Sequence, residues 1–256
     1  MQSHSKREFG FVELLTPDGY NPKLKKGRAR GYASAVLHLA PASLSGVNVC
    51  QFASVGCAAA CLNTAGHGGI VKRGQTTNDV QLARIARTQL LFNDRFAFNA
   101  LLVKAIRAHI RRALRKGLIP VIRLNGTSDL PWERLRLNDG RTVLETFPDV
   151  QFYDYTKSPK RALASAAGQL PANYTLTFSR SEANGADVTA VLAAGGNVAA
   201  VFSGGLPDVY GGHRVINGDL DDLRFLDPRG VVVGLSAKGR GKHDRSGFVI
   251  QPARAA

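Results

Sequence analysis

The chain has 256 residues, with 34 Lys and Arg against 19 Asp and Glu, and a formal net charge of +15 at pH 7. An apolar fraction of 44 % beside 21 % charged residues is typical of a globular chain and excludes intrinsic disorder. The longest apolar run, Ala190 to Phe202, is interrupted by glycines and is far shorter than the roughly 20 residues that a membrane-spanning helix needs.

The first 30 residues contain several Gly and Pro and show no sustained hydrophobic period, which predicts an irregular N-terminal arm (1–30). The opening residues hold no apolar stretch that could act as a signal peptide, so we expect a cytoplasmic protein. The remainder, 31–256, shows no linker, repeat or low-complexity tract, and we expect it to form one domain.

Beyond the arm, strand-like and helix-like segments follow one another. Tyr32 to Leu39 alternates with a period of two and predicts the first strand. A turn-rich segment at 41–69 separates it from two helices, one starting near Asn78 and one running from Asp94 to Lys116. Further strands are predicted at 118–124, 150–155, 174–178, 197–202 and 230–235, and further helices at 160–167 and 187–194.

This order makes about six β/α units and favours an α/β fold with a mostly parallel sheet. Right-handed crossovers would curl such a series into a partial (β/α)6 barrel. In parallel sheets, ligands bind beyond the carboxyl ends of the strands. We therefore expect the functional site among the loops that follow the strands, including the segment 41–69.

All three cysteines of the chain, Cys50, Cys57 and Cys61, lie in that segment. An odd number of cysteines in a cytoplasmic chain argues against a disulfide framework. A structural zinc site uses closer Cys pairs and a fourth Cys or His, for which His67 is the nearby residue. Three cysteines in one loop match a 4Fe–4S cluster with three protein ligands better. Zinc, and inert or redox-active thiols, are the alternatives.

Three protein ligands leave one of four irons open. That iron could bind a side chain such as His67, which would make the cluster electronic or structural. It could bind S-adenosylmethionine and cleave it. It could also bind water or a substrate oxygen and act as a Lewis acid.

Two motifs, CQFASVGC followed by CLNTAG at 50–66 and RLNGTSD followed by WE at 123–133, resemble the bacteriophage gene product eighty-eight family. The resemblance covers about residues 30 to 250 and implies a phage protein acting in the host cell cytoplasm, without implying a reaction. The layout also resembles the partial barrel of radical S-adenosylmethionine enzymes, where a three-cysteine loop follows the first strand. The cysteine spacing differs from the Cys-x3-Cys-x2-Cys of those enzymes.

Polar residues at the predicted carboxyl edge are the candidates for catalysis. Arg123 and Asn125 are expected on one strand face with Asp129 just beyond, where the carboxylate could orient Arg123, a substrate or an iron-bound water, or simply close the loop. On the late strands, Lys238 with Ser179 forms a candidate nucleophile–base pair, and solvated side chains are the alternative.

The leading hypothesis is thus a 4Fe–4S protein whose open iron acts as a Lewis acid in the hydrolysis of an ester or another small carbonyl substrate. The alternatives are a radical enzyme that uses S-adenosylmethionine, and a non-catalytic protein that binds nucleic acid or a host protein. For the last, the predicted helix 94–116 carries a stripe of Lys104, Arg107, Arg111 and Arg115 that could follow a phosphate backbone. The same stripe also fits a solvated face of a basic protein.

Overall fold

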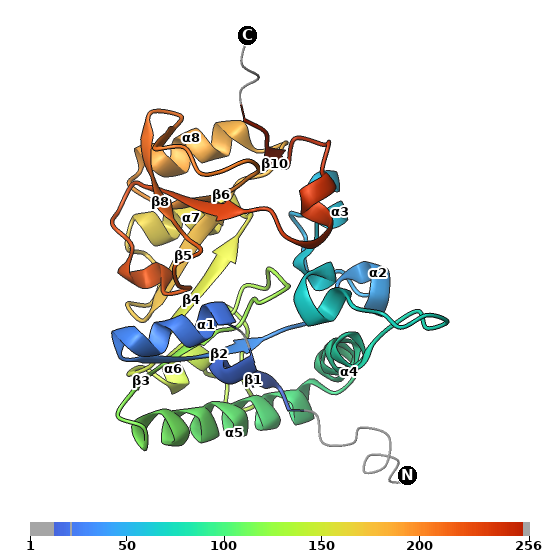
Figure 1. Cartoon of the computed structure of the whole chain (residues 1–256). Helices are drawn as coiled ribbons and strands as arrows, with labels where there is room; N and C mark the ends of the chain where they lie inside the picture. The colour runs from blue at the N-terminus through green and yellow to red at the C-terminus, as the bar shows by residue number, and fades with distance from the viewer. Residues whose placement is uncertain (1–12, 21, 253–256) are drawn as a thin grey trace.

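The computed structural model in Figure 1 describes residues 13–20 and 22–252 as an α/β protein with an open, mostly parallel sheet. The strands are β1 (Leu15–Pro17), β2 (Tyr32–Leu37), β3 (Ile119–Arg123), β4 (Gln151–Thr156), β5 (Tyr174–Ser179), β6 (Val198–Phe202), β7 (Val209–Tyr210), β8 (His213–Asn217), β9 (Val232–Ser236) and β10 (Val249–Ile250). The α-helices are α1 (Pro22–Lys26), α2 (Ala42–Ser45), α3 (Val55–Ala59), α4 (Asp79–Asn93), α5 (Arg95–Leu114), α6 (Val143–Thr146), α7 (Pro159–Ala166) and α8 (Gly185–Ala193). Short 3-10 helices are η1 (Asp18–Tyr20), η2 (Gly27–Arg30), η3 (Leu62–Thr64), η4 (Gly66–Gly69), η5 (Arg224–Leu226) and η6 (Gly239–His243).

The strand order is β1-β2-β3-β4-β5-β6-β9-β8-β7, with β10 also pairing to β6. Every pair from β2 to β9 along this path is parallel, as is β8 with β9, whereas β1 and β7 join antiparallel at the two edges. The predicted parallel α/β sheet is therefore confirmed. The connection from β6 to β9 differs from the predicted β/α unit, because it contains the hairpin β7–β8 and the short helix η5 in place of an α-helix.

Capping residues position the two long helices where the sequence predicts them. Asn78 accepts from the Gln81 N–H while the Gln81 side chain accepts from the Asn78 N–H, which starts α4. Asp94 accepts from the Ala97 N–H and starts α5. The apolar side of α5, with Phe98 buried, packs against β1, β2 and β3 over the largest apolar core of the molecule.

The opposite face of the sheet is partly polar. Ser34, Tyr153 and Thr177 are buried there, and Val121 and Tyr153 pack against Leu223 from the segment that leads into η5. In Figure 1 the helix α1 lies in front of β2 on this side. A polar face enclosed by short helices suits a binding site better than the apolar face beneath α5 does.

The N-terminal arm is more regular than its composition suggests. Residues 1–12 lie outside the described part of the chain, but 15–20 and 22–30 form β1, η1, α1 and η2, where the sequence predicts an irregular arm that could hold a short strand. The reason is burial: Leu14, Leu15 and Leu24 are nearly inaccessible to solvent, and burying such side chains stabilises the local structure.

No helix within the described residues is long and apolar enough to cross a bilayer.

Candidate functional site

The cysteine segment lies beyond the carboxyl ends of the strands, where Figure 1 places α2 and α3 past the arrowhead of β2. Two side chains, Ser54 and Glu182, hold the N-terminus of helix α3, which carries Cys57. Ser54 caps it by accepting from the Cys57 N–H at 3.2 Å. The Glu182 carboxylate, from the loop after β5, accepts from the Gly56 N–H at 2.7 Å and from the Ser54 hydroxyl at 2.8 Å. These hydrogen bonds anchor the cysteine loop to the loop that follows β5.

Residues near the C-terminus cover this segment closely. A Cβ atom at Gly56 would lie 2.8 Å from Cβ of Phe248, and one at Gly239 would lie 2.9 Å from the Thr64 carbonyl oxygen. Phe248 is held in turn by Arg180, whose Nη1 donates to its carbonyl oxygen at 2.9 Å. Glycine at both positions allows η6 and the chain before β10 to approach the cysteine loop.

All three cysteines are free and only partly exposed. The Cys50 Sγ lies 3.9 Å from the Thr127 carbonyl oxygen. Burial, followed by the neighbouring Cys61 and Cys57, raises the pKa of Cys50 to about 12. Burial also raises the pKa of Cys57. Cys61 lies near enough to Cys50 and Cys57 to disfavour their ionisation, and thiolates at these two positions need a cationic partner.

Within the described residues, no three His, Cys, Asp or Glu side chains lie close enough together to hold a single metal ion. The sulfur atoms that bind a four-iron cluster stand farther apart than the ligands of a single ion, because each thiolate binds a different iron atom. His67, the predicted fourth ligand, is exposed, and its carbonyl oxygen accepts from the Asn78 amide at 3.1 Å.

Lys157, directly after β4, occupies the centre of the site. Its Nζ donates to the Ser179 Oγ at 2.6 Å and lies 5.3 Å from the centroid of the Phe248 ring. Its charge and a hydrogen bond lower the pKa of Cys57 against the larger effect of burial. The sequence predicts this loop at the carboxyl edge, but Lys157 was not among the candidate catalytic residues. The structure pairs Ser179 with Lys157 and not with the predicted Lys238.

Asp129 is fully occupied by two donors. Its Oδ2 accepts from the Lys157 N–H at 2.8 Å, and its Oδ1 accepts from Arg161 Nη1 at 2.6 Å. Arg161 also binds Glu133, with Nε 2.8 Å from Oε1, and all three side chains are less than a tenth exposed. The carboxylate therefore orients the loop that presents Lys157. The predicted partnership of Asp129 with Arg123 is not formed.

Asn125 closes its own loop and does not line the site. Its Oδ1 accepts from Ser128, from the Leu130 N–H and from Trp132 Nε1, and its Nδ2 donates to the Leu130 carbonyl oxygen. The prediction that it shares a strand face with Arg123 is wrong because β3 ends at Arg123 and the alternation stops there. Trp132 is buried.

Arg123 faces the polar side of the sheet. Its Nη1 lies 3.1 Å from the Asp222 Oδ2, and its guanidinium carbon is 4.6 Å from the centroid of the Tyr155 ring. Burial alone would raise the pKa of Asp222, but Lys23 and Arg123 hold it at about 2. The Arg123 Nε has no hydrogen-bond partner in the described part of the chain. Arg123 is thus a fixed charge on the polar face of the sheet.

Another arginine, Arg84, lies beside the cysteine loop. Arg84 on α4 donates to Asn63 Oδ1 at 2.7 Å, and Cys61 opposes the lowering of the Arg84 pKa by burial. Burial, followed by the charges of Arg84 and Arg123, lowers the pKa of His38 to about 3. A neutral imidazole among guanidinium groups means that this side of the site is electropositive.

Lys238 lies outside this group. Its Nζ is 2.7 Å from the Asp219 Oδ1, and its side chain is about half exposed, at 48 %. The same carboxylate accepts from the Ser236 N–H at 2.8 Å. The structure therefore divides the predicted set of five polar residues. Arg123 lies on the polar face of the sheet, Asn125 and Asp129 lie within loops, Ser179 lies beside Lys157, and Lys238 lies on the surface.

A family model described as "Gene product 88" matches residues 13–252 of this chain. No curated protein and no solved structure matches it.

Proposed function

Since the chain belongs to the gene product 88 family, as the match over residues 13–252 shows, we propose a function from its site: the protein binds a 4Fe–4S cluster through Cys50, Cys57 and Cys61. The observation that carries this proposal is the cationic surrounding of three mutually interacting thiols. Lys157 lies beside Cys57, and Arg84 lies within electrostatic reach of Cys61. Thiolates around a cluster carry net negative charge, and fixed cations stabilise them in a partly buried loop.

The proposed activity is hydrolysis of a small ester or another carbonyl substrate in the cytoplasm of the host cell. A cluster held by three thiolates supplies, when bound, one iron without a protein ligand, which is a Lewis acid toward a carbonyl oxygen or water. Lys157 places an ammonium group between Cys57 and Ser179, where negative charge would develop on a reacting oxygen. Arg123, with its unpartnered Nε, and Arg84 would attract an anionic substrate.

A finer description of the fold is part of this proposal. Strands β2 to β6 and β9 follow one another in a parallel series, with α5, α7 and α8 packed on them and η5 packed against β4 and β5. We propose that the series acts as a partial barrel like that of radical S-adenosylmethionine enzymes, with the polar face inside. Radical chemistry is the alternative reaction, and release of methionine and deoxyadenosine under reducing conditions would identify it.

Ester hydrolysis by the cluster-loaded protein tests the proposed function. Protein reconstituted anaerobically with iron and sulfide should turn brown, contain both elements in equal amounts, and hydrolyse an activated ester without added S-adenosylmethionine or reductant. Lys157→Met should lower the rate by about 10²-fold because it removes the donor at the reacting oxygen. Iron and sulfide content, measured on the same samples, should fall far less.

The matched control is Lys160→Met, which removes an exposed lysine three residues away and should leave the rate unchanged. Equal hydrolysis by cluster-free protein would show that iron is not the catalyst. A colourless protein that carries zinc and no sulfide would contradict cluster binding itself.

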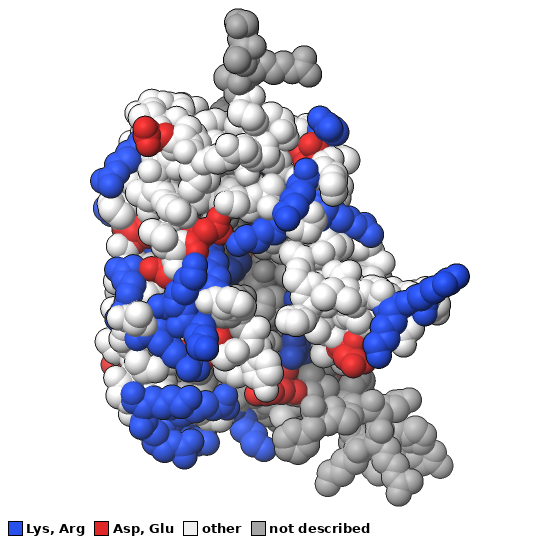
Figure 2. All heavy atoms as spheres, in the orientation of Figure 1, with Lys and Arg blue, Asp and Glu red and all other residues white. Residues whose placement is uncertain are grey.

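A second candidate function, nucleic-acid binding, rests on α5. Lys104, Arg107 and Arg111 are exposed, and none of them forms an ion pair with a carboxylate in the described part of the chain. Arg115, directly after the helix, continues the row. Figure 2 shows Lys and Arg side chains gathered at the lower left, over α5. Unpaired cations in a row are the arrangement that a phosphate backbone neutralises.

If duplex DNA or RNA binds there, affinity should fall steeply with salt. The double variant Lys104→Ala/Arg111→Ala should reduce the slope of log affinity against log salt concentration by about 2, since each lost phosphate contact contributes about 1. Fluorescence anisotropy with a labelled duplex measures it. Lys25→Ala, an exposed lysine on α1, is the control. Identical slopes for the native chain and the double variant would exclude α5 as the binding surface.

A further inference from the structure

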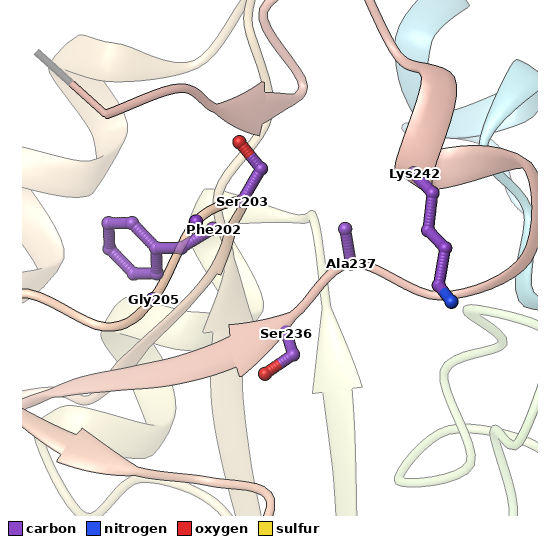
Figure 3. A pocket seen from close by; sticks show the side chains of 7 residues that line it. Phe202, Ser203, Gly205, Ser236, Ala237 and Lys242 are labelled. Atoms are coloured by element: carbon purple, nitrogen blue, oxygen red, sulfur yellow. The ribbon is translucent and has the colours of Figure 1, made fainter.

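A second hollow lies at the carboxyl ends of β6 and β9, apart from the cysteine loop. It is an open cavity of about 200 Å³, lined by Ser203, Gly204, Gly205, Ser236 and Lys242 among others. Figure 3 shows Ser203 and Lys242 on opposite sides of the opening, with Ala237 between them. Ala237 belongs to the small apolar group around Phe248 and Val249 that also contacts Cys57. The cavity and the cysteine site thus share one wall.

The loop after β6 lines this cavity with two glycines, Gly204 and Gly205. Gly204 and Gly205 have φ angles of +73° and +118°. Residues other than glycine are strained in this backbone conformation. The Ser203 N–H is taken by the Ile250 carbonyl oxygen at 3.0 Å, whereas neither glycine N–H has an acceptor in the part of the chain that the structure describes. Successive free N–H groups in such a turn form a concave site for an anion.

The cavity carries a positive charge, which suits an anion. Lys242, on η6, is exposed and forms no ion pair with a carboxylate of the described residues. The carboxylate of Asp219, which accepts from the Ser236 N–H, is already neutralised by Lys238 at 2.7 Å. The Ser203 hydroxyl donates to Gln251 Oε1 at 2.7 Å and could turn to a ligand. Residues with backbone, hydroxyl and ammonium donors therefore line one cavity.

We propose that this cavity binds the phosphate group of a small molecule. A tetrahedral phosphate has three or four oxygens that accept hydrogen bonds in different directions, and a planar carboxylate would leave part of this donor set unused. The N–H groups of Gly204 and Gly205 hold one side of the phosphate, and Lys242 neutralises its charge from the other. The position at the carboxyl ends of parallel strands, after a glycine-rich loop, is where such folds place phosphate groups. The proposal does not depend on a cluster.

Isothermal titration with inorganic phosphate and with glycerol phosphate, on the native full-length protein, tests this site. Both should bind, and Lys242→Met should weaken binding at least tenfold, while Lys242→Arg should retain most of it. Tighter binding of glycerol phosphate would assign the site to a phosphate ester, and equal binding would assign it to the free ion. Lys160→Met, which removes one exposed lysine on α7, should change nothing.

Failure of both phosphates to bind at millimolar concentration would overturn the proposal. Undiminished binding by a folded Lys242→Met variant would do the same. Ser203→Ala gives a second readout, because it removes a hydroxyl without changing charge and should weaken phosphate binding while leaving acetate binding unaffected. Cys57→Ala should bind phosphate as the native chain does, which separates the fate of this site from that of the cysteine site.

Discussion

Replacing any one of Cys50, Cys57 or Cys61 by Ala should abolish cluster incorporation. Two thiolates hold a four-iron cluster poorly, and in the described part of the chain His67 is exposed instead of gathered with the cysteines. The free energy of metal binding is also partly free energy of folding, so only the native chain should gain thermal stability on reconstitution. Iron and sulfide analysis with thermal unfolding, before and after reconstitution, measures both effects.

The cluster-free variants provide the control for folding. Burial raises the pKa of the Cys50 and Cys57 thiols and favours their neutral form, and removing one cysteine should change the unfolding temperature of the cluster-free protein only slightly. Incorporation that is unchanged in all three single variants would remove the basis for the proposed cofactor. A loss confined to one cysteine would instead indicate a different set of ligands.

The second large effect is expected at Arg161, which holds the loop beneath the site. Arg161→Met leaves the carboxylates of Asp129 and Glu133 buried without a counter-charge, and should destabilise the protein by about 3–5 kcal/mol. Because Asp129 also accepts from the Lys157 N–H, the variant should lose ester hydrolysis even under conditions in which it is folded. Urea denaturation followed by circular dichroism measures the stability change.

Arg136→Met gives the comparison for this effect. Its ion pair with Glu145 is exposed, at 59 % and 49 % for the two side chains, and such pairs contribute under about 1 kcal/mol. The triple variant Arg161→Met/Asp129→Asn/Glu133→Gln should recover much of the loss because the buried charges are gone. A loss of unfolding free energy below about 1 kcal/mol for Arg161→Met alone would show that water already screens the two carboxylates.

Local signals in the sequence predicted most of the regular elements. The caps at Asn78 and Asp94 and the period of α5 locate both long helices, and alternation locates β2. Edge strands such as β1 and β10 have two or three residues and show no period that could be recognised. The order within arm 15–30 depends on burial of Leu14 and Leu24 against distant segments, which no local pattern reveals.

The sequence predicted that the cysteine segment lies at the carboxyl edge of the sheet. It did not predict which side chains of the candidate site pair with one another. Asp129 and Arg161 are 32 positions apart, and Lys157 and Ser179 are 22 apart. The pairing of β3 with β4 brings the first two together, and the pairing of β4 with β5 the second two. The prediction for Asn125 extended strand alternation beyond the last residue of β3. The direction of a side chain in a loop depends on hydrogen bonds that form only after folding.

The close approach of Gly56 to Phe248 and of Gly239 to Thr64 has a consequence for the order in which the molecule is made. The wall over the cysteines comes from residues 239–250, which leave the ribosome well after the cysteines, because a chain emerges from its N-terminus. A nascent chain therefore exposes Cys50, Cys57 and Cys61 before their cover exists, and the proposed cluster would meet an open loop if it were delivered then. In a folded chain this cover includes residues next to the two-residue strand β10, whose pairing with β6 is short enough to open locally.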